Sequence, residues 1–112
     1  MSYKMYGIPN CDTVKKARIF LEKKKISYDF SDFKKTPPTE QDLLRWEKFY
    51  GALPVNKRGP TFRKIKEQFE KSSPKEQLAL LIANSSAIIR PIVEKNNKVV
   101  AIGFDEDKLV AN

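Results

Sequence analysis

The stretch that decides the fold of this chain reads Tyr6-Gly7-Ile8-Pro9-Asn10-Cys11-Asp12-Thr13-Val14-Lys15-Lys16-Ala17-Arg18. A short alternating apolar run, residues 3–6, precedes it and a lysine-rich helical pattern follows it, so the stretch joins a strand to a helix. Cys11, the only cysteine of the chain, lies at this junction. Free backbone N–H groups and the positive end of the helix dipole favour the thiolate there, and the thiolate is the reactive form of cysteine.

The N-terminal part of the chain predicts a βαβ unit. Val14, Ala17 and Leu21 recur at helical spacing, which predicts a helix from about residue 11 or 12 to residue 24. Residues 26–33 then alternate between apolar and polar side chains, as in a strand with one polar face. A strand, a helix and a second strand within about 30 residues form a βαβ unit with a right-handed crossover.

The middle of the chain predicts three helices, over about 40–50, 63–69 and 74–84. The first and the last carry capping boxes, in which a hydroxyl residue, Thr39 or Ser73, precedes an acidic residue, Asp42 or Glu76, by three positions. A glycine follows the first of these helices, where a C-cap is expected.

The C-terminal part predicts two short strands, 92–94 and 99–102, joined by an asparagine-containing turn, because asparagine tolerates positive φ. Asp105 can start a last short helix. The order β-α-β, helices, β-β-α predicts an α/β fold with a mixed four-stranded sheet. This is the layout of a single thioredoxin-like domain, residues 1–112, with a helical insertion over about 37–86.

The composition excludes several classes of protein. The chain has 112 residues, one cysteine and no histidine. Cys-His catalysis, Ser-His-Asp catalysis and most zinc sites are therefore excluded, and no metal site is expected. A single cysteine rules out a disulfide framework and fits a reducing compartment. Since no apolar run reaches the ~18 residues of a membrane span and no signal-peptide core is present, we expect a cytoplasmic protein with no membrane contact. We also expect a monomer.

The net charge is +8, from 22 basic and 14 acidic residues. The basic residues are scattered and are mostly lysines on expected helix surfaces, so a solvated surface is the default interpretation. The net charge is the only feature of the sequence that supports a nucleic-acid-binding role. Five aromatic residues are interpreted as core and not as a binding surface: Tyr28, Phe30, Trp46, Phe49 and Phe62.

Cys11 can be read as a small buried apolar residue or as a nucleophile. Its polar neighbours Asn10, Asp12 and Thr13 favour the nucleophile, and we expect them to contribute to substrate binding. Val14 occupies the position of the second cysteine in a C-x-x-C motif, so the chain cannot resolve its own mixed disulfide. An external thiol must do so, and glutathione, acting as a co-substrate, is the obvious candidate.

Arginines at two places in the sequence are candidates for binding an anion, since the planar guanidinium pairs with oxyanions and carboxylates. Arg90 directly precedes Pro91 at the entry to a predicted strand, and an X-Pro bond is the natural place for a cis peptide. Arg58 lies in a basic loop, where an exposed surface arginine is an equal alternative. The remaining arginines are interpreted as helix-surface groups: Arg18, Arg45 and Arg63.

The opening stretch resembles the first motif of the arsenate reductase (ArsC)/Spx family and is most similar to its YffB-like branch. Two later stretches agree in order: Asn56-Lys57-Arg58-Gly59-Pro60-Thr61-Phe62-Arg63 and Ile89-Arg90-Pro91-Ile92-Val93. The resemblance implies a thioredoxin-like fold with a helical insertion and a nucleophilic Cys11. It further implies that Arg58 and Arg90 face the cysteine, and that Pro91 is cis.

The chain departs from the family at two positions. Arsenate reductases of this family that couple to glutathione use a third arginine near the C-terminal end, whereas residues 101–105 here contain none. The Spx regulators, which bind the α subunit of RNA polymerase, commonly carry a C-x-x-C switch that Val14 interrupts.

The leading hypothesis is a glutathione-dependent reductase, of the thiol/disulfide or the arsenate type, that acts on a small or protein thiol or on an oxyanion. Arg58, Arg90 and Pro91 would then help to bind the substrate. The alternative is an Spx-like regulatory module that binds RNA polymerase or another protein.

Overall fold

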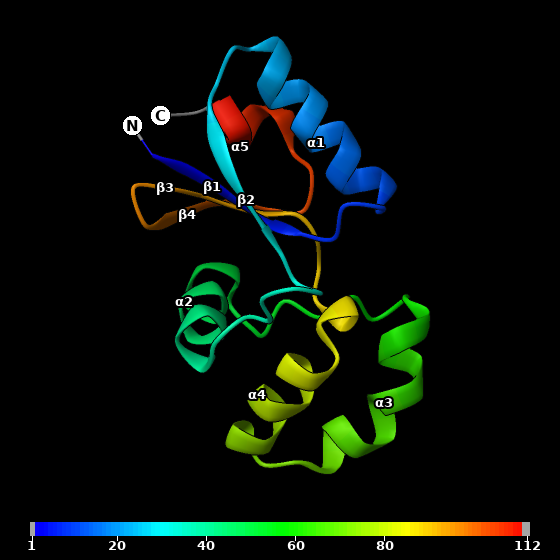
Figure 1. Cartoon of the computed structure of the whole chain (residues 1–112). Helices are drawn as coiled ribbons and strands as arrows, with labels where there is room; N and C mark the ends of the chain where they lie inside the picture. The colour runs from blue at the N-terminus through cyan, green and yellow to red at the C-terminus, as the bar shows by residue number, and fades with distance from the viewer. Residues whose placement is uncertain (1, 111–112) are drawn as a thin grey trace. The chain divides into compact units, whose positions relative to one another are not determined.

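The computed structural model describes residues 2–110. The chain divides into two compact units, and Figure 1 traces both by residue number. The first unit combines Met1–Thr36 with Arg90–Asn112, and the second is Pro37–Ile89. The helical middle of the chain therefore forms a unit of its own, close to the predicted insertion.

The first unit is a mixed four-stranded sheet with two helices. Its elements are β1 (Tyr3–Gly7), α1 (Asp12–Lys23), β2 (Tyr28–Asp32), β3 (Ile92–Lys95), β4 (Lys98–Ile102) and α5 (Glu106–Val110). The strand order is β2-β1-β3-β4, with β1 parallel to β2 and the other neighbours antiparallel. The predicted α/β sheet, with a parallel pair from the βαβ unit and an antiparallel pair from the C-terminal part, is confirmed.

Both helices of the first unit pack on one face of its sheet, as Figure 1 shows. α1 contributes the predicted apolar stripe, all of it fully buried: Val14, Ala17 and Leu21. α5 adds Leu109, and the strands supply Met5 and Val93. This apolar layer fixes α1, and with it the start of α1, against the sheet.

The connections of the first unit follow from its turn residues. Asn96 and Asn97 both adopt positive φ, 54° and 67°, in the predicted hairpin turn between β3 and β4. At the end of β1, a Cβ on Gly7 would lie 2.8 Å from Cγ2 of Val14. The absence of a side chain at Gly7 therefore allows α1 to approach the strand that leads to Cys11.

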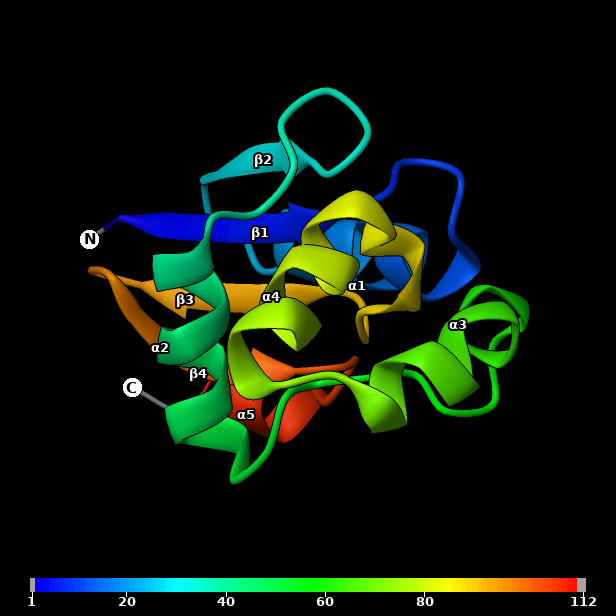
Figure 2. The ribbon, with the colours of Figure 1, turned by 90° about the horizontal axis from the view of Figure 1, so that it is seen from below.

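The second unit is helical: α2 (Glu40–Tyr50), α3 (Pro60–Lys71), α4 (Pro74–Ala83) and a single 3₁₀ turn, η1 (Ser85–Ala87). Within it, α4 contacts both α2 and α3 (Figure 2). The capping boxes at Thr39 and Ser73 are present as predicted. Gly51 closes α2 in the left-handed conformation, with φ 92°.

One helix is longer than its sequence pattern predicted. α3 was expected over 63–69, but it starts at Pro60. The Gly59-Pro60 pair predicted a loop, whereas Pro60 takes the first helical position, where its missing N–H costs nothing. Among the described residues, no helix has both the length and the apolar character needed to cross a membrane.

Candidate active site

Cys11 is the N-cap residue of α1, as the junction between strand and helix predicted. Its backbone is extended, with φ −91° and ψ 127°, and its carbonyl accepts the N–H of Lys15 at 2.9 Å. On the other side, the N–H of Cys11 donates to the carbonyl of Ile8 at 3.2 Å, which closes the turn that follows β1. These bonds place the thiol at the positive end of the helix.

The surroundings of the thiol favour its ionised form. Partial burial raises the pKa of Cys11, but the N–H of Val14, the hydrogen bond and charge of Arg90, and the N–H of Thr13 together lower it further. The net pKa lies below that of an ordinary cysteine.

Arg90 reaches the thiol because of the strand order. β3 lies beside β1 and runs antiparallel to it, with Ile92 opposite Tyr6. Arg90, two residues before β3, therefore lies near the end of β1, where the turn to Cys11 begins. The Arg90-Pro91 peptide bond is cis, as predicted, and the carbonyl of Pro91 accepts the N–H of Gly103 at 2.8 Å.

The other predicted site residues of the first unit either flank Cys11 in the sequence or belong to the Arg90-Pro91 pair. Asn10, Asp12 and Thr13 are exposed, Cys11 and Arg90 are partly buried, and Pro91 is buried. A half-buried sulfur with exposed polar neighbours is accessible to a substrate. The contribution of these predicted residues to substrate binding stays a prediction.

Arg58 belongs to the second unit and is exposed there. It lies in a tight turn in which the N–H of Gly59 donates to the carbonyl of Asn56 at 3.1 Å. Gly59 is also the N-cap of α3, and a Cβ at this position would come within 2.8 Å of the Asn56 amide nitrogen. The turn is thus well defined within its unit, and the role of Arg58 stays a prediction.

The free N–H groups that the sequence predicted at the start of the helix include those of Thr13 and Val14, and the Val14 N–H has the largest single lowering effect on the pKa of Cys11. Sequence reasoning did not name Val14 as this donor, since it used the residue as part of the core and as the position of an absent second cysteine. Val14 is the third residue after the N-cap, so its N–H is free of the helical ladder. Among residues 2–110, no three His, Cys, Asp or Glu side chains gather as metal ligands.

Comparisons with known proteins identify the family of the chain. The model of the ArsC family matches residues 6–112, and the chain belongs to this family. An uncharacterized protein of Haemophilus influenzae is 37% identical over 109 residues, which cover 96% of this chain and 95% of that one. The global transcriptional regulator Spx of Streptococcus agalactiae is 27% identical over 92% of this chain and 77% of its own.

Solved structures of similar proteins share the thioredoxin-like fold. A YffB protein superposes with a TM-score of 0.80 at 35% identity, covering 94% of this chain and 93% of its own. A possible arsenate reductase from Streptococcus mutans gives a TM-score of 0.76 at 29% identity, over 91% of this chain and 90% of its own.

Proposed function

We propose that the protein is a reductase with one nucleophilic cysteine, Cys11, and that glutathione regenerates it. The observation that carries the proposal is the position of the thiol. It lies at the start of α1, beside Arg90, with its pKa lowered by the first-turn N–H groups and by the guanidinium. A lowered pKa raises the fraction of the thiol present as thiolate, and the thiolate is the nucleophilic form.

The first step of the proposed reaction is attack on a mixed disulfide between a substrate thiol and glutathione. The Cys11 thiolate forms a new bond to the glutathione sulfur, and the S–S bond to the substrate breaks. The substrate leaves as a thiolate and takes up a proton from water. The substrate has then gained two electrons, and Cys11 is joined to glutathione.

The second step needs a second thiol from solution, because Cys11 is the only cysteine. A glutathione thiolate attacks the glutathione sulfur of the adduct, the bond to Cys11 breaks, and oxidised glutathione leaves. The Cys11 thiolate is thereby regenerated. The Cys11 thiolate is the leaving group of this step. Arg90 assists its departure, because the positive charge of Arg90 stabilises the thiolate.

The arginines are proposed to hold an anionic part of the substrate or of glutathione. The position of Arg90 beside the thiol supports this role. Arg58, exposed in its turn, is proposed as a further anion-binding residue. Arsenate is a second candidate substrate, since several structural relatives bear the name arsenate reductase.

The test combines thiol titration with turnover. The rate of alkylation of Cys11 by iodoacetamide is followed against pH, and reduction of a glutathionylated peptide or of arsenate is followed through coupled oxidation of NADPH by glutathione reductase. We expect a pKa below that of an ordinary cysteine and turnover that Cys11→Ser abolishes. Arg63→Gln, which removes an exposed arginine of α3, serves as the matched control for Arg58→Gln and Arg90→Gln. An ordinary pKa together with no turnover on either substrate would refute the proposal.

A second candidate function is a protein-binding regulator, favoured by the similarity to Spx over 92% of the chain. Such a module needs no reactive thiol for binding. Retention of purified RNA polymerase on the immobilised chain, unchanged by Cys11→Ser, would support it. No retention of the polymerase would remove this candidate.

A further inference from the structure

The structure contains a pocket at the far end of α1 that the proposed reaction does not use. Its volume is about 490 Å³, and the side chains around it come from α1, the following turn and β2: Arg18, Glu22, Lys25, Ile26, Ser27, Tyr28 and Phe30. Arg18 lies seven residues after Cys11, which is about 10 Å along a helix axis. The pocket is therefore distinct from the thiol site.

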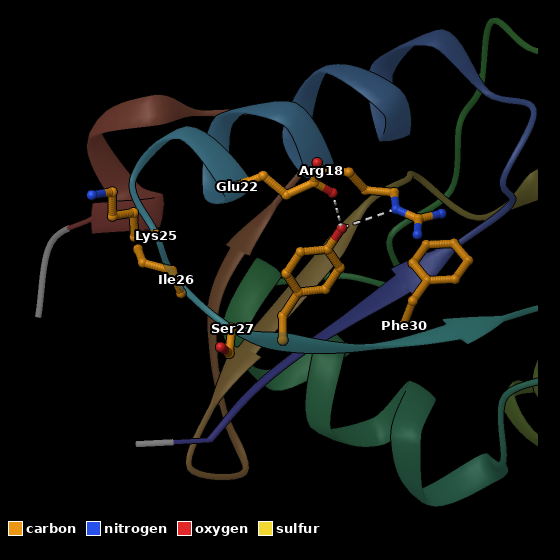
Figure 3. Close-up of a pocket in the computed structure, with 7 residues that line it drawn as sticks. Arg18, Glu22, Lys25, Ile26, Ser27 and Phe30 are labelled. Atoms are coloured by element: carbon orange, nitrogen blue, oxygen red, sulfur yellow. Dashed lines mark hydrogen bonds between the residues drawn. The ribbon is translucent and has the colours of Figure 1, made fainter.

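Arg18 is held in one orientation within this pocket. Its Nε donates to the hydroxyl of Tyr28 at 3.0 Å, and its guanidinium carbon lies 4.4 Å from the ring centroid of Phe30. Figure 3 shows the guanidinium stacked beside the Phe30 ring. Stacking and the Nε bond restrict the side chain before any ligand arrives, so little conformational entropy remains to be lost on binding.

Glu22 faces Arg18 across the same hydroxyl. The Tyr28 hydroxyl donates to Oε2 of Glu22 at 2.9 Å (Figure 3). Burial raises the pKa of Tyr28; the hydrogen bond from Arg18 opposes this and that to Glu22 adds to it, so the hydroxyl stays protonated. Tyr28 thus separates two opposite charges, with Nε and Oε2 at most about 6 Å apart.

Arg18 and Glu22 both have polar atoms that remain available to bind a ligand. Among the described residues Arg18 forms no ion pair, and its two Nη groups donate no hydrogen bond. The second carboxylate oxygen of Glu22 likewise accepts none within residues 2–110. A guanidinium fork pairs with a carboxylate, and the carboxylate of Glu22 pairs with an ammonium.

We propose that this pocket binds a free α-amino acid with an apolar side chain. The carboxylate of the ligand pairs with the Nη groups of Arg18, and its ammonium pairs with Glu22. The carboxylate and the ammonium of an α-amino acid are attached to the same carbon, which suits two side chains whose Nε and Oε2 atoms are at most about 6 Å apart. The apolar side chain of the ligand rests on Ile26, which lines the pocket, because the Phe30 ring is already covered by the guanidinium of Arg18.

The test uses three probes that differ only in their charges: L-phenylalanine, 3-phenylpropionate and phenethylamine. Each is titrated into the ¹⁵N-labelled full chain, and the amide shifts of residues 25–28 are followed by NMR. We expect saturable shifts with phenylalanine and binding at least about tenfold weaker for each single-charge probe, since losing one charged hydrogen bond costs more than tenfold in affinity.

Variants assign the binding to its residues. Arg18→Gln and Glu22→Gln should each weaken phenylalanine binding by about tenfold or more. Arg18→Lys keeps the charge without the fork, and we expect an intermediate loss. Lys23→Gln removes an exposed charge of the same helix outside the pocket and should change nothing.

Three results would overturn the proposal: no saturable shift, shifts that persist in the Arg18→Gln and Glu22→Gln variants, or equal binding of a single-charge probe. The spectra themselves report whether each variant is folded. Cys11→Ser should bind phenylalanine like the unmodified chain. This outcome distinguishes binding at the pocket from the proposed reductase activity, which Cys11→Ser abolishes.

Discussion

Replacing Gly7 by alanine should destabilise the protein and disturb the thiol site at the same time. The added Cβ would lie 2.8 Å from Cγ2 of Val14, well inside van der Waals contact. Val14 is fully buried and belongs to the apolar layer under α1, so it cannot move aside freely. Overpacking of this kind costs about 1–3 kcal/mol.

The position of Gly7 connects this cost to function. Cys11 is the N-cap of α1, so displacing α1 from the sheet moves the sulfur away from Arg90, whose hydrogen bond and charge lower the pKa of Cys11. We therefore expect slower alkylation of Cys11 at neutral pH in Gly7→Ala. The midpoint of thermal unfolding should fall by about 4 °C for each kcal/mol lost.

The matched control is Gly51→Ala. Gly51 has a φ of 92° and no atom within 4 Å of an added Cβ among its described neighbours, so the change introduces backbone strain without a clash. It should cost about 1 kcal/mol and leave alkylation of Cys11 unchanged. Wild-type stability and wild-type alkylation in Gly7→Ala, measured by urea unfolding and iodoacetamide, would refute the reasoning.

Arg90→Gln should shift the alkylation profile of Cys11 to higher pH, because it removes both the hydrogen bond and the charge that lower the pKa; an unshifted profile would show that Arg90 does not act on the sulfur. Leu21→Ala should lower the free energy of unfolding by about 2–5 kcal/mol in urea titrations, since Leu21 is fully buried. Ser73→Ala should cost about 1 kcal/mol by the same measurement, because Ser73 caps α4. The pKa of Glu76 is lowered by its bonds to Ser73. The ionised carboxylate therefore contributes fully to the stability of the fold above the ordinary carboxyl pKa, and this contribution is lost as the pH falls through the lowered pKa. Glu76→Gln should flatten the stability profile in that acidic window, and an unchanged profile would contradict the assignment.

Local sequence signals predicted most of the secondary structure. The capping boxes at Thr39 and Ser73 each depend on residues three positions apart, and both formed as expected. The asparagine turn at 96–97 depends on the tolerance of two adjacent residues for positive φ. The start of α3 was missed because Gly59-Pro60 is equally compatible with a turn and with a helix N-terminus.

The candidate site was less accessible to local reasoning. The approach of Arg90 to Cys11 depends on β3 pairing with β1, which is a property of the sheet and not of either segment. Only the family resemblance linked the two residues in advance. Arg18 shows the same limit: it was interpreted as a helix-surface group, but β2 places Tyr28 and Phe30 against it.

The central claim is that Cys11 takes up a glutathione moiety and releases it to a second thiol. Mass spectrometry of the chain after exposure to a glutathionylated peptide, before and after addition of reduced glutathione, tests this directly. We expect one glutathione on Cys11, release of the free peptide thiol, and loss of the adduct when glutathione is added. An unmodified Cys11, or an adduct that reduced glutathione does not remove, would contradict it.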